Sequence, residues 1–404
     1  MTPEEQLQIL TSGCVEVITE EELLERLKTK ERLTVKYGAD PTAPDLHLGH
    51  SIPLNKLRQF QELGHRVVFI IGDFTAMIGD PSGQSQTRKQ LSREEVERNA
   101  RTYLQQVGKI LDLDKTEIVF NSQWFSSMDL EDVINQLASK YTLARMLERD
   151  DFAIRFKSEK PIYIHELLYP LMQGYDSLMI SADVEIGGTD QKFNMLVGRE
   201  LQRENGQPPQ IVMTLPLLEG LDGVQKMSKS LNNYVGLTEP PQEMFGKLMS
   251  ISDELMWRYL SLLLNYSQEK IAKLKSKVER GELNPMDLKM ELAYRIVATY
   301  HNEEKAEKAK EEFEKVFRKR EIPSQIEEIW IDKENIKDGK IWIIKLLLLS
   351  GYVSGTREAK RLISQGAIKV NKQQISNSNL DIPVEDGMII QIGKRKFFKV
   401  RIGE

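Results

Sequence analysis

The sequence predicts an α/β protein in which a parallel-sheet core with a helical insertion is followed by an α-helical region and a small α+β module. In the first half of the chain, short apolar segments alternate with longer segments of helical character. Continuous apolar strands separated by helices are typical of parallel sheets that are covered on both faces. After residue 226 the pattern becomes mostly helical, and the C-terminal stretch places strands around one short basic helix.

Four segments have the composition of buried strands, namely 33–37, 66–71, 117–120 and 210–214. In open parallel sheets, ligands bind beyond the carboxyl ends of the strands. We therefore expect the polar residues that follow the first two strands to share one cleft. These residues are Asp40, Thr42, His47, His50 and Asp80.

Helical periodicity predicts helices near 92–111, 130–149 and 162–179, inserted within the sheet or packed on it. Residues 303–320 are highly charged and contain many opposite charges four positions apart, which is typical of a solvated helix. The polar stretch 333–340 has the composition of a linker and is expected to separate the C-terminal module from the helical region.

Composition favours a soluble globular protein. The chain has 404 residues, of which 40% are apolar and 29% charged, and its one cysteine, Cys14, excludes a disulfide framework. Residues 1–10 lack the basic and apolar regions of a secretory leader. The longest apolar run, 341–349, is too short to span a bilayer. These features predict a cytoplasmic protein without a membrane partner.

The C-terminal segment is basic although the whole chain is acidic. The net charge is −5, but residues 341–404 hold 11 Lys and Arg against 5 Asp and Glu, a net of +6 that leaves −11 for the preceding residues. A short helix is expected at 357–365, with Arg357, Lys360 and Arg361 on the side opposite its apolar face. A basic module on an acidic body indicates a polyanion as partner.

Two short motifs point to one chemistry. His47-Leu48-Gly49-His50 is expected at the start of a helix, where free N–H groups and the helix dipole favour phosphate. Lys226-Met227-Ser228-Lys229-Ser230 is expected on a mobile loop, whose ammonium groups can reach a triphosphate from the other side. Alone, the first motif is as typical of a plain helix start with surface histidines, and the second is more typical of a solvated basic loop. Together, and in this order, they predict transfer of an adenylyl group from ATP.

Further motifs accompany these two in a fixed order. They are Asp40-Pro41-Thr42, Gly79-Asp80-Pro81-Ser82-Gly83, Tyr169-x-x-x-Gln173-x-x-Asp176 and Gly187-Gly188-Thr189-Asp190-Gln191. The ordered set resembles the bacterial tyrosyl-tRNA synthetases over nearly the whole chain, because the basic tail also resembles an S4-type RNA-binding domain. The resemblance implies a Rossmann-like class I catalytic core with a connective insertion over 1–225. It further implies an anticodon-region helical domain over 226–332 and an S4-like domain over 338–404.

The resemblance implies a tyrosine–tRNA ligase. Such an enzyme converts L-tyrosine and ATP to tyrosyl-adenylate and pyrophosphate, and then transfers the tyrosyl group to tRNA(Tyr). For the nucleotide end, the resemblance implies that the ATP phosphates are bound by Thr42, His47 and His50, the transition state is stabilised by Lys226 and Lys229, and the ribose is held by Gly188 and Asp190. Mg²⁺ is expected on the nucleotide, whose phosphates supply most of its ligands, and we expect no structural metal.

For the amino-acid end, the resemblance implies a set of residues around the tyrosine ammonium and carboxylate, namely Asp40, Asp80, Tyr169, Gln173 and Gln191. It implies that Asp176 accepts the phenol hydrogen bond. It also implies a homodimer and contacts of the tail with the long variable arm of tRNA. The candidate RNA contacts are Arg357, Lys360, Arg361 and Lys369.

Helix spacing supports the amino-acid site independently of the resemblance. Tyr169, Gln173 and Asp176 recur at i, i+4 and i+7 and therefore share one face of a helix. Polar groups on an otherwise apolar face need a partner, which a bound amino acid provides. A buried acceptor for the phenol also explains the rejection of phenylalanine, which is the known basis of tyrosine selection in this class of enzyme.

One position departs from the family pattern. Many members place a second phenol-binding tyrosine at the end of the first strand, but the aligned residue here is Lys36, and Tyr37 follows it. A shift of one residue in a strand turns the side chain to the other face of the sheet. The sequence therefore leaves open whether Tyr37 or another group assists Asp176.

Three other functions are alternatives to a tyrosine–tRNA ligase. A tryptophanyl-tRNA synthetase shares the core and a similar Tyr-x-x-x-Gln-x-x-Asp helix, but the segment 187–191 and the S4-like tail argue against it. A small-molecule nucleotidyltransferase with an HxGH helix leaves the segment 226–230 and the basic tail unexplained. An RNA-binding protein without catalysis is the third reading, which both intact motifs disfavour.

Overall fold

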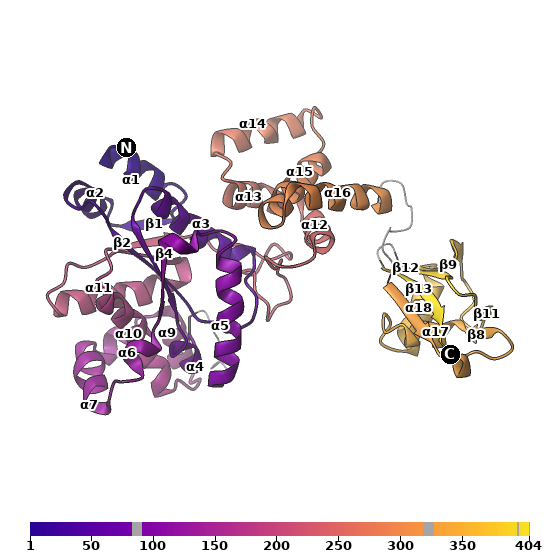
Figure 1. Cartoon of the computed structure of the whole chain (residues 1–404), viewed down its shortest axis with the longest axis horizontal. Coiled ribbons are helices and arrows are strands. Elements are labelled where there is room, and N and C mark those ends of the chain that lie inside the picture. The colour runs from indigo at the N-terminus through magenta and orange to yellow at the C-terminus, as the bar shows by residue number, and fades with distance from the viewer. Residues whose placement is uncertain (83–90, 318–326, 394–395, 404) are drawn as a thin grey trace. The chain divides into compact units, whose positions relative to one another are not determined.

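A computed structural model describes the chain except for the segments 83–90, 318–326 and 394–395 and residue 404 (Figure 1). The chain divides into two compact units, 1–302 and 303–404. The three domain boundaries expected from the sequence stay predictions. In the described part of the chain, no helix is both long and apolar enough to cross a membrane.

The first unit is built on a six-stranded sheet with the order β1-β6-β5-β2-β3-β4. Its strands are β1 (Glu16–Ile18), β2 (Thr34–Ala39), β3 (Arg66–Ile71), β4 (Thr116–Phe120), β5 (Val184–Gly188) and β6 (Ile211–Leu215). Neighbouring strands are parallel except β1, which runs antiparallel to β6. All four strands expected from the sequence are present, and the α/β prediction is confirmed, whereas β1 and β5 were not anticipated.

The strand order reverses between β2 and β5. From β2 the chain continues to β3 and β4 on one side, and from β5 it continues to β6 on the other side. Figure 1 shows α3 and α5 to one side of the strands and α10 and α11 to the other. Such a switch point opens a crevice at the carboxyl ends of the two central strands.

Helices cover the sheet and continue beyond it in the first unit. They are α1 (Pro3–Thr11), α2 (Glu20–Thr29), α3 (Leu48–Glu62), α4 (Thr75–Ile78), α5 (Arg93–Val107), α6 (Ser122–Phe125), α7 (Leu130–Asp132), α8 (Leu143–Met146), α9 (Asp150–Lys157), α10 (Ile164–Met179), α11 (Lys192–Glu204), α12 (Pro241–Met249), α13 (Asp253–Leu264), α14 (Gln268–Glu279) and α15 (Pro285–Tyr300). The helices expected near 92–111 and 162–179 correspond to α5 and α10. The mostly helical region expected after residue 226 corresponds to α12–α15.

The prediction of a single helix over 130–149 is wrong. The segment consists of α7, a π-helical turn at Val133–Leu137, a 3₁₀ turn at Ala138–Lys140 and α8. The carboxylate of Asp129 accepts the N–H of Asp132 and caps the start of α7, whereas Thr142 lies inside the segment and its hydroxyl accepts the N–H of Arg145. The cap at Thr142 starts α8 as a new helix, so local capping there overrides the continuous apolar period.

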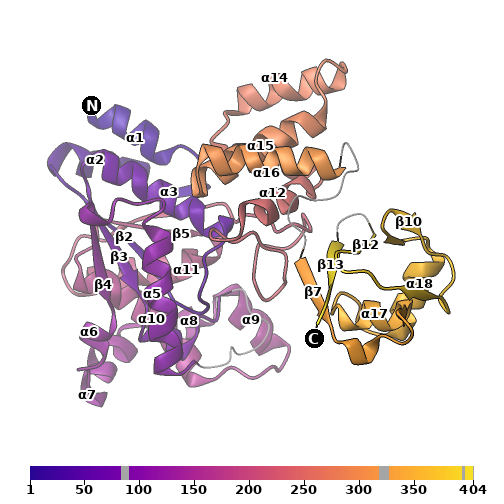
Figure 2. The same cartoon turned by 45° about the vertical axis from the view of Figure 1, so that its right-hand side comes forward.

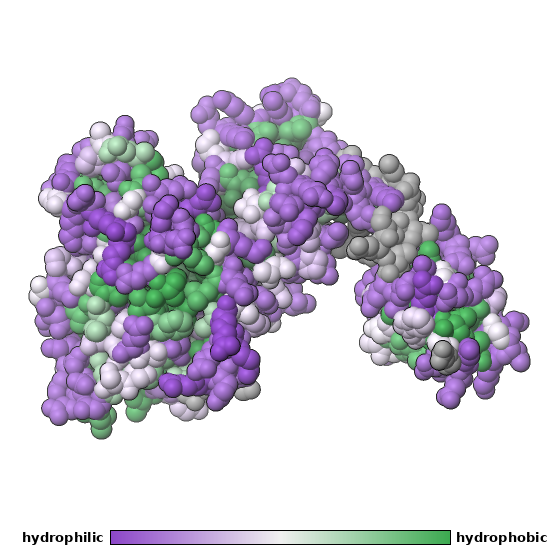
Figure 3. All heavy atoms as spheres, in the orientation of Figure 1, coloured by the Kyte–Doolittle hydropathy of each residue, from purple (hydrophilic) through white to green (hydrophobic). Residues whose placement is uncertain are grey.

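The second unit contains α16 (Glu303–Phe317), followed by a small α+β fold. Figure 3 shows a largely hydrophilic surface over α16, as expected for a solvated helix; the last three residues of its predicted range lie outside the described residues. A five-stranded sheet has the order β10-β9-β12-β13-β7, and β8 pairs with β11. The strands are β7 (Glu327–Ile331), β8 (Lys340–Trp342), β9 (Ile368–Val370), β10 (Gln373–Gln374), β11 (Asp381–Pro383), β12 (Ile389–Ile392) and β13 (Lys396–Ile402).

Two helices, α17 (Ile343–Leu349) and α18 (Thr356–Ser364), accompany this sheet (Figure 2). Ala359 and Ile363 of α18 are buried with Phe398 in one apolar core. After α18, Gly366 has a φ of +67°, a left-handed conformation that favours glycine at a helix end. The short basic helix and its glycine stop are thus where the sequence predicts them.

The prediction of a linker over 333–340 is wrong. Residues Lys333–Asn335 form a 3₁₀ turn, and Lys337 and Lys340 exchange backbone hydrogen bonds of 2.8 and 2.9 Å. Asp338 and Gly339 between them have φ values of +49° and +71°. An Asp-Gly pair with two positive φ angles is typical of a tight hairpin turn, so this dipeptide was the signal against a linker.

Candidate functional site

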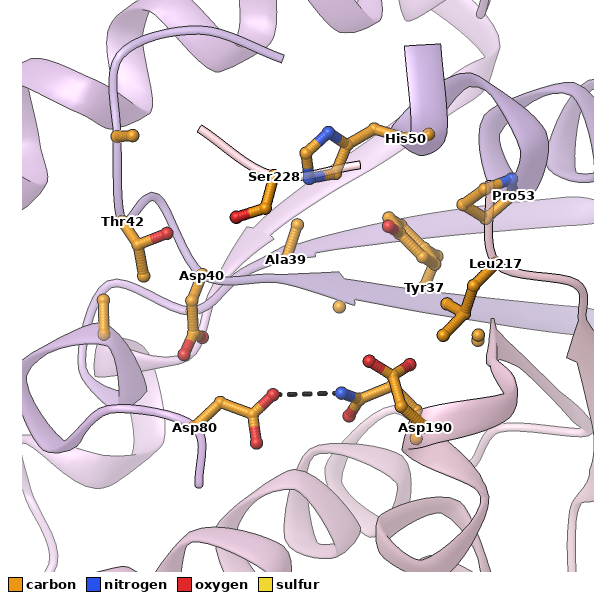
Figure 4. A pocket seen from close by; sticks show the side chains of 18 of the residues that line it. Tyr37, Ala39, Asp40, Thr42, His50, Pro53, Asp80, Asp190, Leu217 and Ser228 are labelled. Atoms are coloured by element: carbon orange, nitrogen blue, oxygen red, sulfur yellow. Dashed lines mark hydrogen bonds between the residues drawn. The ribbon is translucent and has the colours of Figure 1, made fainter. Parts of the chain in front are cut away.

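A cavity of about 590 Å³ opens at the carboxyl ends of β2 and β5 (Figure 4). Its walls come from β2 and the following loop, the start of α3, α10, the end of β5 and the segment 226–230. Every residue predicted to bind ATP or tyrosine lines it: Tyr37, Asp40, Thr42, His47, His50, Asp80, Tyr169, Gln173, Asp176, Gly188, Asp190, Gln191, Lys226 and Lys229. The structure therefore brings both motifs together, while the role of each residue stays a prediction.

The two histidines of the first motif shape the start of α3. The Nδ1 atom of His47 accepts the N–H of Gly49 at 3.2 Å, and the N–H of His47 is donated to Nδ1 of His50 at 3.2 Å. Because each Nδ1 accepts, each neutral ring carries its proton on Nε2 and keeps one N–H to donate. Gly49 leaves room for this arrangement, since a Cβ there would lie 2.9 Å from Cε1 of His47.

Both imidazoles are neutral at pH 7. Burial, together with the positive charge of Lys229, lowers the pKa of His50 to about 4. Burial also lowers the pKa of His47 well below its usual value, and the neighbouring His50 ring and the ammonium groups of Lys229 and Lys226 act in the same direction. The site thus combines neutral N–H donors with two ammonium groups, which suits a polyanion.

The loop between β2 and α3 is fixed by α5. The Asn99 amide donates to the carbonyl of Pro41 at 2.9 Å, and the Gln106 amide donates to that of Pro44 at 2.9 Å. The N–H of Leu46 is donated to Oε1 of Gln106 at 2.6 Å. These bonds hold the loop, and with it the first histidine, in a defined position beside the cavity.

The two lysines of the second motif are paired with carboxylates of the cavity. Nζ of Lys226 lies 2.8 Å from Oδ2 of Asp190, and Nζ of Lys229 lies 3.4 Å from Oδ2 of Asp45. Burial lowers the pKa of Lys229, although Asp45 acts against this. An anion that enters the cavity must therefore compete with these carboxylates for the ammonium groups.

Asn233 organises the lysine-bearing loop, and the sequence analysis did not single it out. Its Oδ1 accepts the N–H of Ser228 at 2.8 Å, and its Nδ2 donates to Oδ2 of Asp222 at 2.7 Å and to the carbonyl of Lys226 at 3.3 Å. The side chain is buried, so loss of these bonds would leave unpaired polar groups. Asn233 thereby connects both halves of the loop.

The far end of the cavity contains a chain of polar contacts around Asp40. The hydroxyl of Tyr169 donates to Oδ2 of Asp40 at 2.9 Å, and the hydroxyl of Thr75 donates to Oδ1 at 2.7 Å. Gly72 allows the carboxylate to approach, because a Cβ there would lie 2.0 Å from Oδ1 of Asp40. The amide of Asn121 donates to Thr75 Oγ1 at 3.0 Å and extends the chain.

Asp176 is buried at this end and accepts two hydrogen bonds. The indole Nε1 of Trp124 donates to Oδ1 at 3.0 Å, and the amide of Asn121 donates to Oδ2 at 3.4 Å. Burial raises the pKa of Asp176 to about 7, against the lowering effects of Lys36 and of both donors. The sequence left open which group assists Asp176, and the structure places Trp124 and Asn121 in hydrogen-bond contact with it.

A second polar network lines the wall between these ends. Oδ2 of Asp80 accepts the amide of Gln191 at 3.0 Å, the hydrogen bond dashed in Figure 4. The amide of Asn194 donates to Oε1 of Gln191 at 3.2 Å and to Oε1 of Gln173 at 2.9 Å. Gln173 in turn donates to Oε1 of Glu185 at 3.1 Å. The predicted amino-acid ligands thus hold one another in place.

Lys36 and Tyr37 lie on opposite faces of β2. Nζ of Lys36 donates to the carbonyl of Gln173 at 2.7 Å, and so faces α10. The ring of Tyr37 lies 5.7 Å from that of Phe69 and projects near Pro53 and Leu217 (Figure 4). Its pKa is raised by burial and by the charge of Asp190, which places it at the predicted ribose end of the cavity.

The predicted RNA contacts are accessible in the second unit. Arg357, Lys360 and Arg361 are exposed on α18, and Lys369 is half-buried on β9. Arg361 approaches Glu358 only at 4.0 Å, an exposed pair one helical turn apart. Their role in RNA binding stays a prediction.

Comparison with known proteins identifies the family. The profile of tRNA synthetases class I (W and Y) matches residues 28–318, and that of the S4 domain matches residues 341–386. The chain belongs to the class I tRNA synthetases, in the branch that contains the tryptophan and tyrosine enzymes. Within this branch, tyrosine–tRNA ligases of bacteria match it over the full length at 50–55% identity, and it is a member of that bacterial family.

The relatives span the whole chain. A tyrosine–tRNA ligase of Carboxydothermus hydrogenoformans is 55% identical over 400 residues, covering 98% of this chain and 97% of its own. One of Aquifex aeolicus is 53% identical over 403 residues and covers 100% of both chains. The solved tyrosyl-tRNA synthetase of Archaeoglobus fulgidus in complex with L-tyrosine has a TM-score of 0.63 and 25% identity, covering 76% of this chain and 99% of its own. The family and fold expectations are confirmed.

We predict that His50 does not protonate near neutral pH. Burial and Lys229 should keep its titration midpoint near pH 4, whereas an exposed histidine titrates near pH 6.5. NMR titration of ring-labelled protein, with His50→Gln to assign the resonance, measures the midpoint. Lys229→Met should raise it, because one of the positive charges that disfavour protonation is removed. A wild-type midpoint above pH 6 would contradict the buried neutral ring.

Proposed function

We propose that the chain is a tyrosine–tRNA ligase that works in two steps. The carboxylate of tyrosine attacks the α-phosphorus of ATP, tyrosyl-adenylate forms and pyrophosphate leaves. The tyrosyl group then passes from the adenylate to a terminal ribose hydroxyl of tRNA(Tyr), and AMP is released. The observation that carries this proposal is one cavity with two neutral histidines and two lysines at one end and a buried carboxylate, Asp176, at the other.

The chemistry requires no nucleophile from the protein. The enzyme must align the carboxylate with the α-phosphorus and stabilise the charge that develops on the phosphates. The Nε2–H groups of His47 and His50 are fixed donors for that charge, and Thr42 adds a hydroxyl from the neighbouring loop. We infer that ribose hydroxyls bind Gly188 and Asp190, and that Lys226 then leaves Asp190 for the phosphates.

The amino-acid end selects its ligand by polar contacts. Asp40, Asp80 and Tyr169, with the amides of Gln173 and Gln191, supply acceptors and donors for the α-ammonium and carboxylate groups. Asp176, fixed by Trp124 and Asn121, accepts the phenol O–H. Phenylalanine would leave this buried acceptor without a donor, which is unfavourable.

We propose that Mg²⁺ enters with ATP as part of the substrate. Its preferred ligands are oxygens, and the phosphates supply several of them. Among the residues that the structure describes, no group of three His, Cys, Asp or Glu side chains is placed to hold a metal ion. The bound metal would neutralise phosphate charge beside His47, His50 and the two lysines.

The experiment that tests the function is pyrophosphate exchange into ATP with each of the twenty amino acids added singly. Tyrosine alone should support exchange. Asp176→Ala should lower kcat/KM for tyrosine by about 100-fold or more, since a buried charged hydrogen bond contributes about 2–3 kcal/mol. Tyr37→Phe is the matched control and should leave the preference for tyrosine over phenylalanine unchanged. Exchange with tryptophan alone, or with no amino acid, would exclude the proposal.

We further propose that the second unit binds tRNA through α18 and β9. The S4 match and the basic character of this region support a polyanionic partner. Structured RNA is recognised mainly by shape and by backbone contacts, for which Arg and Lys side chains are suited. The contacts would come from Arg357, Lys360, Arg361 and Lys369.

Neutralising the basic face of α18 should therefore affect only the second step. The variant Arg357→Gln/Lys360→Gln/Arg361→Gln should weaken tRNA binding and lower the salt slope of log Kd by up to about one unit for each lost phosphate contact. Filter binding over a range of salt concentrations measures this slope. Tyrosine-dependent pyrophosphate exchange should be unchanged. An unaltered slope would show that the RNA binds elsewhere.

We propose that the protein forms a homodimer through apolar side chains at the α9–α10 corner. Ile154, Phe156, Tyr163 and Ile164 are 62%, 65%, 53% and 78% exposed. Between them, the buried Arg155 forms an ion pair with Glu166 and fixes the corner. A cluster of large apolar groups on a rigid corner is typical of a protein interface.

Charged substitutions at this corner should dissociate the dimer. Phe156→Asp/Ile164→Asp should raise the dimer dissociation constant by at least about 100-fold, because each central apolar contact contributes about 2 kcal/mol or more. Sedimentation velocity measures the change. Val15→Asp is the control, since Val15 is 59% exposed beside β1. A monomeric wild type, or a double variant that dimerises normally, would refute this interface.

The cytoplasm is the compartment that we infer, because tRNA and ATP are available there. The one cysteine, Cys14, is a free thiol, as a reducing compartment permits. Fractionation of cells that express a tagged chain tests this inference, and enrichment in a membrane or secreted fraction would contradict it.

A further inference from the structure

Beside the phenol end of the cavity lies a buried ion pair that the proposed reaction steps do not use. Lys36 of β2 and Glu185 of β5 are direct register partners, and Nζ lies 3.0 Å from Oε1. Their side chains are 0% and 2% exposed. Burial of two charges has a large desolvation cost, so such a pair is weak evidence for stabilisation and invites a functional explanation.

The pair holds α10 at two positions that flank Asp176. The ammonium group of Lys36 donates to the carbonyl of Gln173 and to Oγ of Ser177, each at 2.7 Å. The carboxylate of Glu185 accepts the amide of Gln173 at 3.1 Å and the hydroxyl of Ser177 at 3.2 Å. The central strands therefore fix the helical turn that carries the phenol acceptor.

We propose that Lys36 is a positioning residue for tyrosine specificity, because it holds the Gln173–Ser177 turn of α10 and its charge keeps Asp176 ionised as the phenol acceptor. The inference rests on the proposed function of Asp176. An ionised carboxylate accepts a hydrogen bond more strongly than a protonated one. A protonated Asp176 would bind tyrosine more weakly and reject phenylalanine less.

The charges around Asp176 support this assignment. Lys36 faces it from β2 and Glu185 from β5, and the pKa of Asp176 is lowered more by the first than it is raised by the second. The nearby carboxylates Asp40 and Asp73 are engaged by the hydroxyls of other side chains. The lysine is therefore the positive charge that opposes the effect of burial, and its loss should favour the protonated acid.

A direct test measures Asp176 without any substrate. The indole N–H of Trp124 donates to Asp176, so its ¹⁵N and ¹H shifts should follow ionisation of the carboxyl group. The chain contains four tryptophans, so the four indole signals are assigned with Trp124→Phe. In Lys36→Met the midpoint should rise by about one pH unit or more, the usual effect of losing a nearby opposite charge. Lys36→Arg should retain a midpoint close to that of wild type.

Kinetics tests the consequence for specificity. At pH 7, Lys36→Met should lower kcat/KM for tyrosine in pyrophosphate exchange by about fivefold, which follows from a shift of about one unit for a group titrating near 7. The tyrosine-to-phenylalanine ratio should fall, and both losses should be restored at higher pH. A merely structural lysine would change the amount of folded enzyme but not the pH profile.

Lys56→Met is the matched control, because Lys56 is also buried and donates to the carbonyls of Leu10 at 2.9 Å and Ser12 at 2.7 Å, outside the lining of the cavity. It should lose stability without a shift of the Trp124 midpoint. If Lys36→Met does not fold, Lys36→Met/Glu185→Gln replaces it and should show a smaller shift in the same direction.

An unchanged midpoint in folded Lys36→Met or Lys36→Met/Glu185→Gln, or the same shift in Lys56→Met, would overturn the inference. A shifted midpoint without a change in the tyrosine-to-phenylalanine ratio would overturn its specificity part. If the wild type shows no tyrosine-dependent exchange, the proposed function fails, whereas the Trp124 titration still tests the effect of Lys36 on Asp176. The two failures are therefore distinguishable.

Discussion

The reversal of strand order between β2 and β5 is the constraint on which the site depends. The chain leaves these two parallel neighbours in opposite directions, toward β3 and β4 on one side and toward β6 on the other. The connections therefore diverge and leave the strand ends uncovered. Into this gap project the start of α3, the end of β5 and one face of α10, which lie far apart in the sequence. Strand ends, a helix start, one face of α10 and the segment 226–230 thus form the cavity together.

Charge in the cavity is balanced mainly by contacts within the protein. Lys226 faces Asp190, Lys229 faces Asp45, and the two histidines are neutral. With the proposed roles of these residues, nucleotide binding would exchange partners: the ribose would take the place of one ammonium group, and the phosphates would take the place of carboxylates. Such an exchange would avoid the cost of an unpaired buried charge at any stage. It would also couple recognition of the sugar to release of the lysine proposed to act on the phosphates.

Much of the fold could be predicted from local patterns, and the exceptions have physical causes. Strands such as β3 are continuous apolar runs, whereas β5 carries Glu185, whose charge is acceptable only because Lys36 lies opposite it in the sheet. Local capping by Thr142 starts a new helix inside the segment that periodicity assigned to one helix. The pairing of Lys36 with Glu185 joins residues far apart in the sequence, so no short sequence window contains it.

Local sequence patterns likewise identified some residues of the candidate site and missed others. Motif residues such as His47 and Lys226 were found because the motif itself expresses a local requirement, a helix start or a loop. Asn121, Trp124 and Asn233 act through partners distant in the fold or along the loop, so no short pattern marks them. Asn121 directly follows a predicted strand, and the strand-end rule applied to that strand would have found it. For the others the sequence carries no comparable signal.

The loop that carries Lys226 and Lys229 is anchored at its base, which limits the volume that the two lysines can explore. The N–H of Leu48 is donated to the carbonyl of Val235, and the N–H of Leu237 to that of Leu46, each at 2.9 Å, so the loop ends beside the helix start that bears the histidines. A short segment anchored at both ends explores a small volume, which corresponds to a high effective concentration of its ammonium groups beside the two histidines. The entropy of bringing the two motifs together is lost once, when the chain folds, and not again in each catalytic cycle.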